Sequence, residues 1–389
     1  MSGHLGRLVA AIHATPPRVV LVLTGGGSNA LADLLAVPGA SRTVLEAVVP
    51  YSEGAMIDFL GGRPDRFCSP QTARAMAMAA FHRALRYGGG NDANAGISCT
   101  ASLATDRPKR GDHRAHLALQ TATTTVTWSL QLAKQRRTRL EEERLVSRLA
   151  LNAVADACEI QDHLELNLYE DERLERTAVD AQPAWRELLL GSIERVRQGD
   201  SAAAGAAAPP VVFPGAFNPL HAGHRGMACI AEEIMAAPVA FEISIINVDK
   251  PPLDYFEIDA RTRQFTADRA LWLTRSSTFE EKSRLFPAAT FVVGSDTLAR
   301  IGNPRYYGND STACRLAIER IADRGCHFLV FGRYLDGRYV HVSDLDLPER
   351  LRSICREVPE QRFREDISSA AIRRQTVPRA GNAKHPRLG

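Results

Sequence analysis

The stretch Val211-Val-Phe-Pro-Gly215-Ala-Phe217-Asn-Pro219-Leu-His221-Ala-Gly223-His224 decides how the chain is interpreted. Its apolar start predicts a strand over Val211–Phe217, and His221–Met235 predicts the helix that follows. Gly215 lets the backbone pass close to a phosphate. His221 and His224 are three residues apart, so both rings share one face at the start of the helix. Free N–H groups and the helix dipole favour an anion at that end.

Two imidazoles at such a helix start can donate hydrogen bonds to phosphate oxygens. They would stabilise charge that develops on a pentavalent phosphorus by position and electrostatics, without a covalent nucleophile. The stretch resembles the G-x-F-x-P-x-H-x-G-H signature of the HxGH nucleotidyltransferase superfamily. The resemblance implies that His221 and His224 are catalytic and that Gly215, Ala216, Phe217 and Gly223 contact the nucleotide. Two surface histidines after a turn would explain a lone H-x-x-H, but not the whole string.

A second motif, Asp366-Ile-Ser368-Ser369-Ala370-Ala-Ile-Arg373, lies near the end of the chain. Its hydroxyls fall where a helix begins, and its guanidinium follows one turn later, which is a suitable grip for a triphosphate. It is similar to the I-S-S-T-x-I-R motif that closes the same superfamily's catalytic domain. The resemblance implies that Ser368, Ser369 and Arg373 bind the nucleotide. The alternative is a capping serine pair with a solvated arginine.

Three weaker signals refine the substrate. A strand expected at Thr290–Val293 ends in Gly294-Ser-Asp296, which resembles the G-x-D segment of nicotinamide/nicotinate-mononucleotide adenylyltransferases and implies that Gly294 and Asp296 face a ribose or base. Phe328–Arg333 resembles a later strand of that family that ends in a phosphate-facing arginine. Lys250, before two prolines, stands where the family often keeps a basic residue near the substrate phosphate. Solvated surface charge is the alternative for Lys250 and Arg333.

The motif also departs from its relatives. Ala216 and Asn218 stand where many relatives have Thr and Asp, and Ala370 replaces the threonine of the last motif. We expect the lost hydroxyls to weaken nucleotide contacts while catalysis persists. The implied reaction is attack of a mononucleotide phosphate on the α-phosphorus of ATP with loss of pyrophosphate, and Mg²⁺ neutralises the triphosphate.

Strand and helix signals alternate through the C-terminal half. Val239–Val248 predicts a second strand, Ala260–Leu273 a second helix, and Phe328–Phe331 a further buried strand. This alternation predicts an α/β fold with a Rossmann-like, doubly wound parallel sheet, in which ligands bind beyond the carboxyl ends of the strands.

The N-terminal half predicts a second α/β domain. Its expected strands are Val19–Leu23 and a pair within His116–Leu130, and its expected helices are Ala30–Leu35, Gln71–Tyr87 after Ser69-Pro70, and an amphipathic Arg139–Leu166. Thr24–Ser28 also fits a dinucleotide-binding loop loosely, with Glu46 about 20 residues on. That signal is weak, because Glu46 opens an apolar run instead of ending one.

Residues 5–165, roughly, resemble the C-terminal amidase domain of the competence-damage-inducible (CinA) family, through Thr24–Ser28, Val37–Ser41, Val49–Ser52, Ser69-Pro70 and Gly96–Thr100. That family hydrolyses the amide of nicotinamide mononucleotide with a serine nucleophile, a tyrosine and a lysine. Tyr51 is kept here, whereas Thr24 stands at the nucleophile position and Met56 at the lysine position. Methionine cannot accept a proton, so we expect a degenerate amidase site. Nucleotide binding, dimer formation, or catalysis by Ser28, Ser98 or Thr100 are the alternatives.

Composition narrows the class of protein. The 389 residues are 45% hydrophobic and 24% charged with a net charge of +3, which argues against a mainly disordered chain, a nucleic-acid binder or a membrane-surface protein. The seven cysteines show no C-x-x-C spacing, so we expect a reducing, cytoplasmic location without a disulfide framework or a zinc site. His113 and His116 are expected to be strand residues on a polar face, not metal ligands, and Lys134–Arg139 to be part of a solvated, salt-bridged helix.

The small, Pro-ending run Gln198–Pro210 predicts a linker. We expect a CinA-like domain over 1–170, a helical segment and linker over 171–210, a nucleotidyltransferase domain over 211–376 and a loose tail over 377–389. The favoured function is adenylyl transfer from ATP to nicotinamide or nicotinate mononucleotide. The alternatives are a phosphopantetheine-type adenylyltransferase, a CTP-dependent cytidylyltransferase, or a nucleotide-binding regulator whose sites have decayed.

Overall fold

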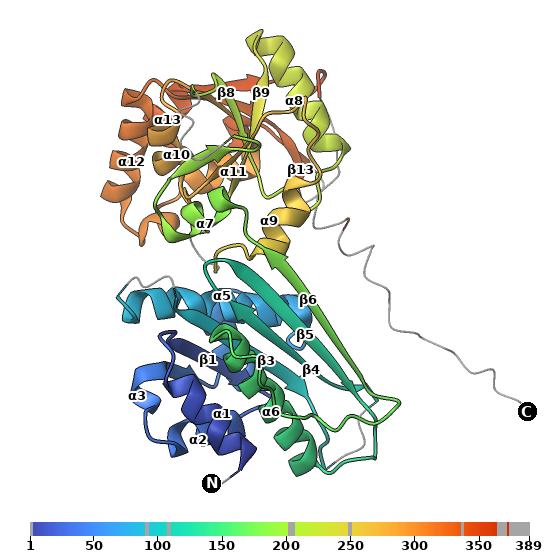
Figure 1. The fold of residues 1–389 in the computed structure, drawn as a ribbon. Helices are drawn as coiled ribbons and strands as arrows, with labels where there is room; N and C mark the ends of the chain where they lie inside the picture. The colour runs from blue at the N-terminus through green and yellow to red at the C-terminus, as the bar shows by residue number, and fades with distance from the viewer. Residues whose placement is uncertain are drawn as a thin grey trace, which may run out of the picture. The chain divides into compact units, whose positions relative to one another are not determined.

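The chain forms two compact α/β units, each with its own sheet (Figure 1). The computed structural model describes residues 3–89, 93–106, 110–200, 207–247, 251–335, 338–363 and 372. Unit 1 consists of Met1–Ile193 and Ile245–Asp259, and unit 2 consists of Glu194–Ser244 and Ala260–Gly389. The expected α/β class is confirmed for both.

Unit 1 is built on a mixed six-stranded sheet in the order β2-β1-β3-β4-β5-β6. β1 pairs in parallel with β2 and β3, and β3 to β6 form an antiparallel meander. The strands are β1 Val19–Thr24, β2 Val44–Val48, β3 Ala95–Ser102, β4 His113–Gln120, β5 Thr124–Leu132 and β6 Arg173–Asp180. The helices are α1 His4–His13, α2 Asn29–Ala36, α3 Ala40–Thr43, α4 Glu53–Leu60, α5 Pro70–Tyr87, α6 Arg139–Ala157 and α7 Pro183–Leu190.

Alternate residues of β1 enter two different cores of unit 1. Val19, Leu21 and Leu23 pack in one cluster with side chains of α1, α2 and α6. Val20 and Val22 pack on the opposite face with side chains of α4 and α5. Because β1 is buried on both faces, its sequence is a continuous apolar run, as is typical of a parallel strand.

Unit 2 is built on a seven-stranded sheet in the order β15-β12-β11-β8-β9-β10-β7. Six strands are parallel, and β7 pairs antiparallel with β10 at one edge. The strands are β7 Arg195–Arg197, β8 Val211–Pro214, β9 Val239–Ser244, β10 Leu271–Thr274, β11 Thr290–Gly294, β12 His327–Phe331 and β15 Cys355–Val358, with a separate hairpin of β13 Arg333–Leu335 and β14 Arg338–Val340.

The chain winds in both directions from β8, which confirms the doubly wound topology. It passes from β8 to β9 and β10 on one side, and later from β11 to β12 and β15 on the other. The order therefore reverses between β8 and β11, where ligands of such sheets bind. The helices of unit 2 are α8 Ala222–Met235, α10 Phe279–Leu285, α11 Ser295–Ile301, α12 Ser311–Asp323 and α13 Glu349–Ser353, with short 3₁₀ turns at Pro304–Tyr307 and Val342–Asp344. The helix α9 Tyr255–Thr262 begins in unit 1 and ends in unit 2, because the units divide between Asp259 and Ala260.

Several expected elements differ from the observed ones. The prediction of one helix over Ala260–Leu273 is wrong: α9 ends at Thr262, and Leu271–Thr274 forms β10. All four residues of β10 are buried in the sheet, and burial on both faces gives an apolar run that resembles a helix segment. The helix expected over Arg139–Leu166 ends at Ala157, because Glu159 takes a left-handed conformation and Asn152 bonds both backbone groups of Leu164.

Strands β8 and β9 are shorter than expected. β8 ends at Pro214 instead of Phe217, because Phe217 has a positive φ of 43°, and β9 ends at Ser244 instead of Val248. The expected seam at Gln198–Pro210 falls between β7 and β8, which belong to the same sheet, and the units divide at Ile193 instead. Arg173–Asp180, expected in a helical segment, forms β6 because it pairs along its length with β5.

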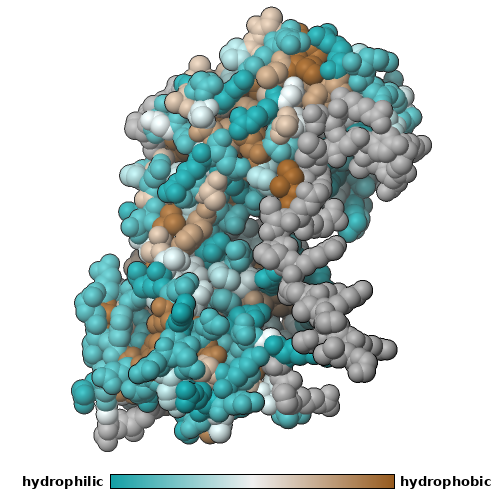
Figure 2. Space-filling model, turned by 90° about the vertical axis from the view of Figure 1, so that its right-hand side faces the viewer, coloured by the Kyte–Doolittle hydropathy of each residue, from teal (hydrophilic) through white to brown (hydrophobic). Residues whose placement is uncertain are grey.

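No described helix is both long and apolar enough to cross a membrane. On the face drawn in Figure 2, hydrophobic residues form separate patches among hydrophilic ones. All seven cysteines are free thiols.

Candidate functional site

The loop after β8 is held by backbone contacts and by one buried aromatic ring. The Gly215 N–H donates to the Glu242 carbonyl at 2.9 Å, which continues the pairing with β9. The Phe217 ring is buried and packs edge-on against Phe213 and His224, with centroids 5.4 and 5.0 Å apart. A Cβ on Gly215 would lie 2.5 Å from the Phe217 ring, so glycine is needed here to admit that ring.

The two motif histidines lie together at the start of α8. Their rings are stacked with centroids 3.7 Å apart, and the His221 backbone N–H donates to His224 Nδ1 at 3.3 Å. Burial, followed by the charges of His221 and Arg333, lowers the pKa of His224 to about 3. His224 is therefore neutral at physiological pH, and because its Nδ1 accepts, its Nε2 carries the proton and can donate.

The carboxyl ends of β11 and β12 bring further predicted residues to the same edge of the sheet. Arg333, two residues after β12, lies with its Nε 3.5 Å from Asp296 Oδ1 in the first turn of α11. A Cβ on Gly294 would lie 2.6 Å from Asp296 Oδ1 and 3.4 Å from Arg333 Nε. A small pocket in unit 2 is lined by His221, Gly223, Met227, Phe331, Gly332, Arg333 and Phe363.

Some of the predicted nucleotide-binding residues make other contacts in the structure, and others lie outside the described residues. Ala216 is exposed, and its carbonyl accepts from Arg261 Nη1 at 3.2 Å. Phe217 is 1% exposed, so its ring serves the core and is not placed to contact a nucleotide. The substrate-phosphate candidate Lys250 and the predicted residues of the second motif, Ser368, Ser369 and Arg373, lie outside the described residues.

The residues matched to the amidase site do not assemble a general base with a nucleophile. The Thr24 hydroxyl donates to the Pro50 carbonyl at 3.2 Å, and the Tyr51 side chain is 71% exposed. Met56 is 2% exposed and packs among apolar residues with Val20 and Val22. The methionine at the family's lysine position therefore belongs to the core.

A carboxylate, Glu143 of α6, occupies the glycine-rich loop after β1. It accepts from the Gly27 N–H at 3.0 Å, the Ser28 hydroxyl at 2.8 Å and the Asn29 N–H at 3.3 Å. These N–H and hydroxyl donors of the loop before α2 are thus bonded to a carboxylate of the protein itself. Sequence reasoning missed Glu143, because Glu141–Glu143 looks like a solvated charge run.

The remaining hydroxyls considered for the N-terminal half donate to the backbone. Ser98 Oγ donates to the Ala73 carbonyl at 2.6 Å, and Thr100 Oγ1 donates to the Phe67 carbonyl at 2.8 Å. Both side chains are buried. Their geometry is that of structural hydroxyls within the sheet.

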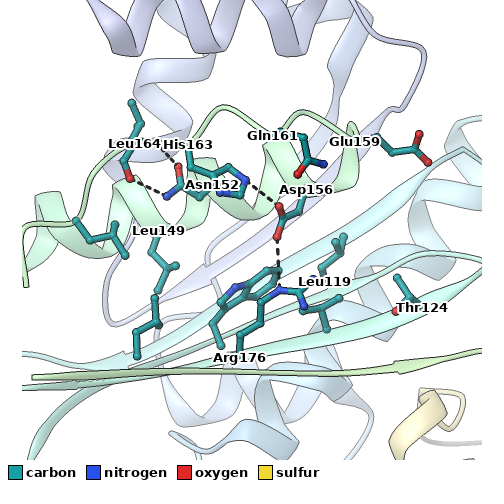
Figure 3. A pocket seen from close by; sticks show the side chains of 14 residues that line it. Leu119, Thr124, Leu149, Asn152, Asp156, Glu159, Gln161, His163, Leu164 and Arg176 are labelled. Atoms are coloured by element: carbon teal, nitrogen blue, oxygen red, sulfur yellow. Dashed lines mark hydrogen bonds and ion pairs between the residues drawn. The ribbon is translucent and has the colours of Figure 1, made fainter.

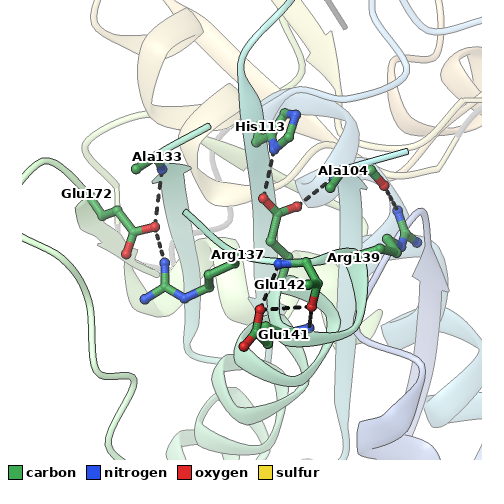
Figure 4. Close-up of polar contacts among 9 residues, drawn as sticks. Ala104, His113, Ala133, Arg137, Arg139, Glu141, Glu142 and Glu172 are labelled. Atoms are coloured by element: carbon green, nitrogen blue, oxygen red, sulfur yellow. Dashed lines mark hydrogen bonds and ion pairs between the residues drawn. The ribbon is translucent and has the colours of Figure 1, made fainter. Parts of the chain in front are cut away.

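The two strand histidines of unit 1 are buried or half-buried, so the expectation of a polar face is wrong. His113 Nδ1 lies 2.7 Å from Glu142 Oε1, and the other oxygen of that carboxylate accepts from the Ala104 N–H at 2.6 Å (Figure 4). His116 Nδ1 lies 3.0 Å from Ser129 Oγ, and burial lowers the pKa of His116 to about 4. Within the described ranges, no group of three or more His, Cys, Asp or Glu could hold a metal ion.

The basic run Lys134–Arg139 is exposed except at Arg137, as expected, but it precedes the helix, because α6 begins only at Arg139. Arg137 pairs with Glu172, and their side chains are 9% and 0% exposed (Figure 4). The same carboxylate accepts from the Ala133 N–H at 3.1 Å. Thr138 and Glu141 form a reciprocal cap at the start of α6.

A second pocket lies in unit 1 and contains none of the predicted site residues. It encloses about 860 Å³ between α6, the segment after it, and strands β4 to β6 (Figure 3). Its charged groups face one another: His163 Nε2 lies 2.8 Å from Asp156 Oδ1, and Arg176 Nε lies 4.0 Å from Asp156 Oδ2. The pocket lacks both the motif histidines and the residues matched to the amidase site.

The chain was compared with known proteins. No protein-family model and no curated protein matches it. Among solved structures it is similar to the competence/damage inducible protein CihA from Agrobacterium tumefaciens, with 21% identity, 40% of this chain and 97% of that chain covered, and a TM-score of 0.33. It is also similar to a competence or damage-inducible protein from Enterobacter asburiae, with 17% identity, coverage of 41% and 98%, and a TM-score of 0.32.

Proposed function

We propose that unit 2 is a nucleotidyltransferase that transfers AMP from ATP to a pyridine mononucleotide and releases pyrophosphate. One observation carries the proposal: His221 and Gly223 of the first motif and Arg333 of the Phe328–Arg333 segment line one pocket at the carboxyl edge of a doubly wound sheet. Asp296 lies beside Arg333 at the same edge. Donors and a positive charge gathered where the strand order reverses suit a phosphate-bearing ligand.

In the proposed mechanism, an oxygen of the acceptor's phosphate bonds to the α-phosphorus of ATP. The bond from that phosphorus to the bridging α–β oxygen breaks, and pyrophosphate leaves with the electron pair. His224, neutral and protonated on Nε2, donates to an oxygen of the α-phosphate, and His221 acts beside it at the helix start. Arg333 supplies positive charge as negative charge builds up in the transition state.

Mg²⁺ is expected to enter with the triphosphate. Asp296 is a carboxylate at this edge, but Arg333 lies 3.5 Å from it, and the other side chains here are imidazole and apolar. This donor set fits a metal held mainly by phosphate oxygens and water, with Asp296 as the residue that would face it. When bound, the metal would neutralise part of the triphosphate charge.

The choice of acceptor rests on the sequence resemblances. The Gly294–Asp296 segment resembles mononucleotide adenylyltransferases, and the N-terminal half resembles a domain that acts on nicotinamide mononucleotide. Both resemblances point to pyridine nucleotides, which makes these mononucleotides the first acceptors to test.

The test is pyrophosphate release by the full chain with Mg²⁺ and either ATP or CTP. The acceptors are nicotinamide mononucleotide, nicotinate mononucleotide, phosphopantetheine and a simple alcohol phosphate, with products identified by mass spectrometry. Release with ATP and a pyridine mononucleotide is the expected result. Release with another pair reassigns the substrate. No release with any pair contradicts the transferase, and ATP binding without turnover then identifies a nucleotide-binding protein.

We expect His221→Ala to lower kcat at least 100-fold, because removing one preformed donor to a developing charge costs about 2.7–4 kcal/mol. His327→Ala is the matched control, since His327 is exposed at the start of β12. Circular dichroism would establish that both variants are folded. Near-normal turnover by a folded His221→Ala protein would contradict the proposed role.

A further inference from the structure

We infer that Gln264, which no motif singled out, is the positioning residue that fixes the loop leading into His221. This inference rests on the proposed function for its catalytic consequence. Its side-chain amide spans the loop: Nε2 donates to the Phe217 carbonyl at 2.9 Å, and Oε1 accepts from the Leu220 N–H at 2.7 Å. Leu220 directly precedes His221, so the amide fixes the backbone immediately before the first histidine.

The geometry requires an amide at this position. The Phe217 carbonyl can only accept, and the Leu220 N–H can only donate, so the bridging group must offer one donor and one acceptor. A carboxylate of the same size would place an acceptor against the Phe217 carbonyl. A methionine would leave both backbone groups without this partner.

The loop needs such support because its backbone departs from ordinary conformations. Phe217 is a non-glycine residue with a φ of 43°, a conformation that costs of order 1 kcal/mol or more and persists only when neighbours impose it. Gln264 bonds the carbonyl of this residue directly. Arg261 bonds the preceding carbonyl, that of Ala216, at 3.2 Å.

Gln264 is itself held from two sides. Its backbone N–H donates to the Arg261 carbonyl at 3.3 Å, and its Nε2 lies 3.3 Å from the same oxygen. The next residue, Phe265, is 9% exposed, and its ring packs on Phe217 and Phe241 with centroids 5.5 and 5.0 Å away. The amide is thus aimed at the loop by the same aromatic cluster that buries Phe217.

The consequence is that the His221 backbone, which donates to His224 Nδ1, is placed through Leu220 and Gln264. Losing the amide should loosen the loop without removing either imidazole. Because the histidines act on the transition state, misplacing them should lower kcat more than it changes the KM for ATP.

The test uses the full chain with Gln264→Met, and Gln131→Met as control, since Gln131 is exposed on β5 of unit 1. We expect amide hydrogen exchange at Leu220 and His221 to be at least tenfold faster in Gln264→Met and unchanged in the control. We also expect kcat to fall at least tenfold while the KM for ATP changes less than threefold. Unchanged exchange, or faster exchange with unchanged kcat, would overturn the inference.

The hydrogen-exchange and the kinetic measurements together separate this inference from the proposed function. If the wild-type chain releases no pyrophosphate, the transferase proposal fails, while hydrogen exchange still decides whether Gln264 holds the loop. If Gln264→Met does not fold, Gln264→Glu replaces it. Its carboxylate still accepts from the Leu220 N–H but cannot donate to the Phe217 carbonyl, so we expect Leu220 to stay protected while kcat falls. Full activity in that variant would refute the need for the donor.

Discussion

His224 illustrates how a single contact sets the chemistry of a residue. It stands at the third position of α8, where Glu or Gln often accepts from the capping residue's N–H, and its Nδ1 accepts from the His221 N–H in that way. The same contact leaves the proton on Nε2. Burial then keeps the ring neutral, so His224 is suited to donate a hydrogen bond and not to supply a positive charge.

The lowered pKa of His224 predicts how stability depends on pH. The unfolded ring titrates near 6.5 and the folded ring at about 3, so the unfolded state binds more protons between these values. Stability from this residue is therefore complete above about pH 6.5 and is lost as the pH falls toward 3, at up to about 1.4 kcal/mol per pH unit.

His224→Gln removes this titration and keeps an acceptor for the His221 N–H. We expect the free energy of unfolding of the variant, relative to the wild type, to rise by about 2 kcal/mol between pH 7.5 and pH 5. Urea denaturation at both pH values measures it. A pH-independent difference would mean that His224 titrates normally in the folded protein.

Met56 allows a direct test of the degenerate amidase site. Met56→Lys restores the residue type that the resemblance implies, but it places a charge in an apolar cluster beside Val20 and Val22. We expect the free energy of unfolding to fall by about 3 kcal/mol. We expect no ammonia release from nicotinamide mononucleotide, because the Thr24 hydroxyl donates to the Pro50 carbonyl.

The control for this substitution is Met56→Leu, which keeps the volume and should cost less than about 1.5 kcal/mol. Ammonia release by the wild type, or its appearance in Met56→Lys, would show that unit 1 retains amidase chemistry.

For single residues, the sequence predicts the positions of those that directly follow parallel strands. It does not predict side-chain contacts that depend on how distant segments pack. His221, Asp296 and Arg333 follow three different parallel strands, so their place at one edge follows from the fold class. Nothing in the neighbouring sequence indicates the contacts of Glu143 and Gln264. Each contacts a loop that is distant in sequence: Glu143 is 116 residues from Gly27, and Gln264 is 44 residues from Leu220.

Among the elements, α6 shows how a helix can look solvated and be buried. Thr138 and Glu141 form its cap on the outside, whereas Glu142 and Glu143 point inward and are 0% and 8% exposed. Four donors reach Glu143: the Gly27 and Asn29 N–H groups and the Ser28 and Ser147 hydroxyls. One face of the helix thus anchors the loop after β1.

Glu143→Gln should lower the free energy of unfolding by about 1–3 kcal/mol, because the amide NH₂ would meet donors where the carboxylate accepts. Glu175→Gln is the control, since Glu175 is exposed on β6 and should change stability by less than about 0.5 kcal/mol. Chemical denaturation of both variants measures the difference. Equal stabilities would indicate that the loop is held by its own backbone.

Elements with strong local signals agree with their prediction, whereas β10 shows how long-range pairing overrides a local pattern. The helix α5 begins at Pro70 with Ser69 as its cap, as the sequence indicates. β10 was missed because Leu271, Trp272 and Leu273 form a short apolar run, which periodicity cannot separate from a buried helix turn. Its neighbours β9 and β7 define it, and both pairings are long-range.

At the scale of the whole molecule, each of the two units is built from two separate stretches of the chain. It passes between the units at 193/194, 244/245 and 259/260, so unit 1 is completed by a segment that follows β9. Within unit 1, Asp254 Oδ2 lies 3.0 Å from Arg74 Nε, and these side chains are 5% and 10% exposed. The Tyr255 hydroxyl donates to the Ala122 carbonyl at 2.6 Å, and its ring stacks on Trp185.

The apparent linker is therefore a poor place to divide the protein. A fragment of residues 1–200 would leave Arg74 buried without its carboxylate, and removing one member of a buried pair costs about 3–5 kcal/mol. We expect its thermal midpoint to lie about 10 °C below that of unit 1 in the full chain, at about 2–4 °C per kcal/mol for a unit of this size. A peptide of residues 245–259 should raise the midpoint, and the same peptide with Asp254→Asn and Tyr255→Phe should raise it less. A fragment as stable as the full chain would mean that the inserted segment only rests on unit 1, and the predicted seam would then be a true domain boundary.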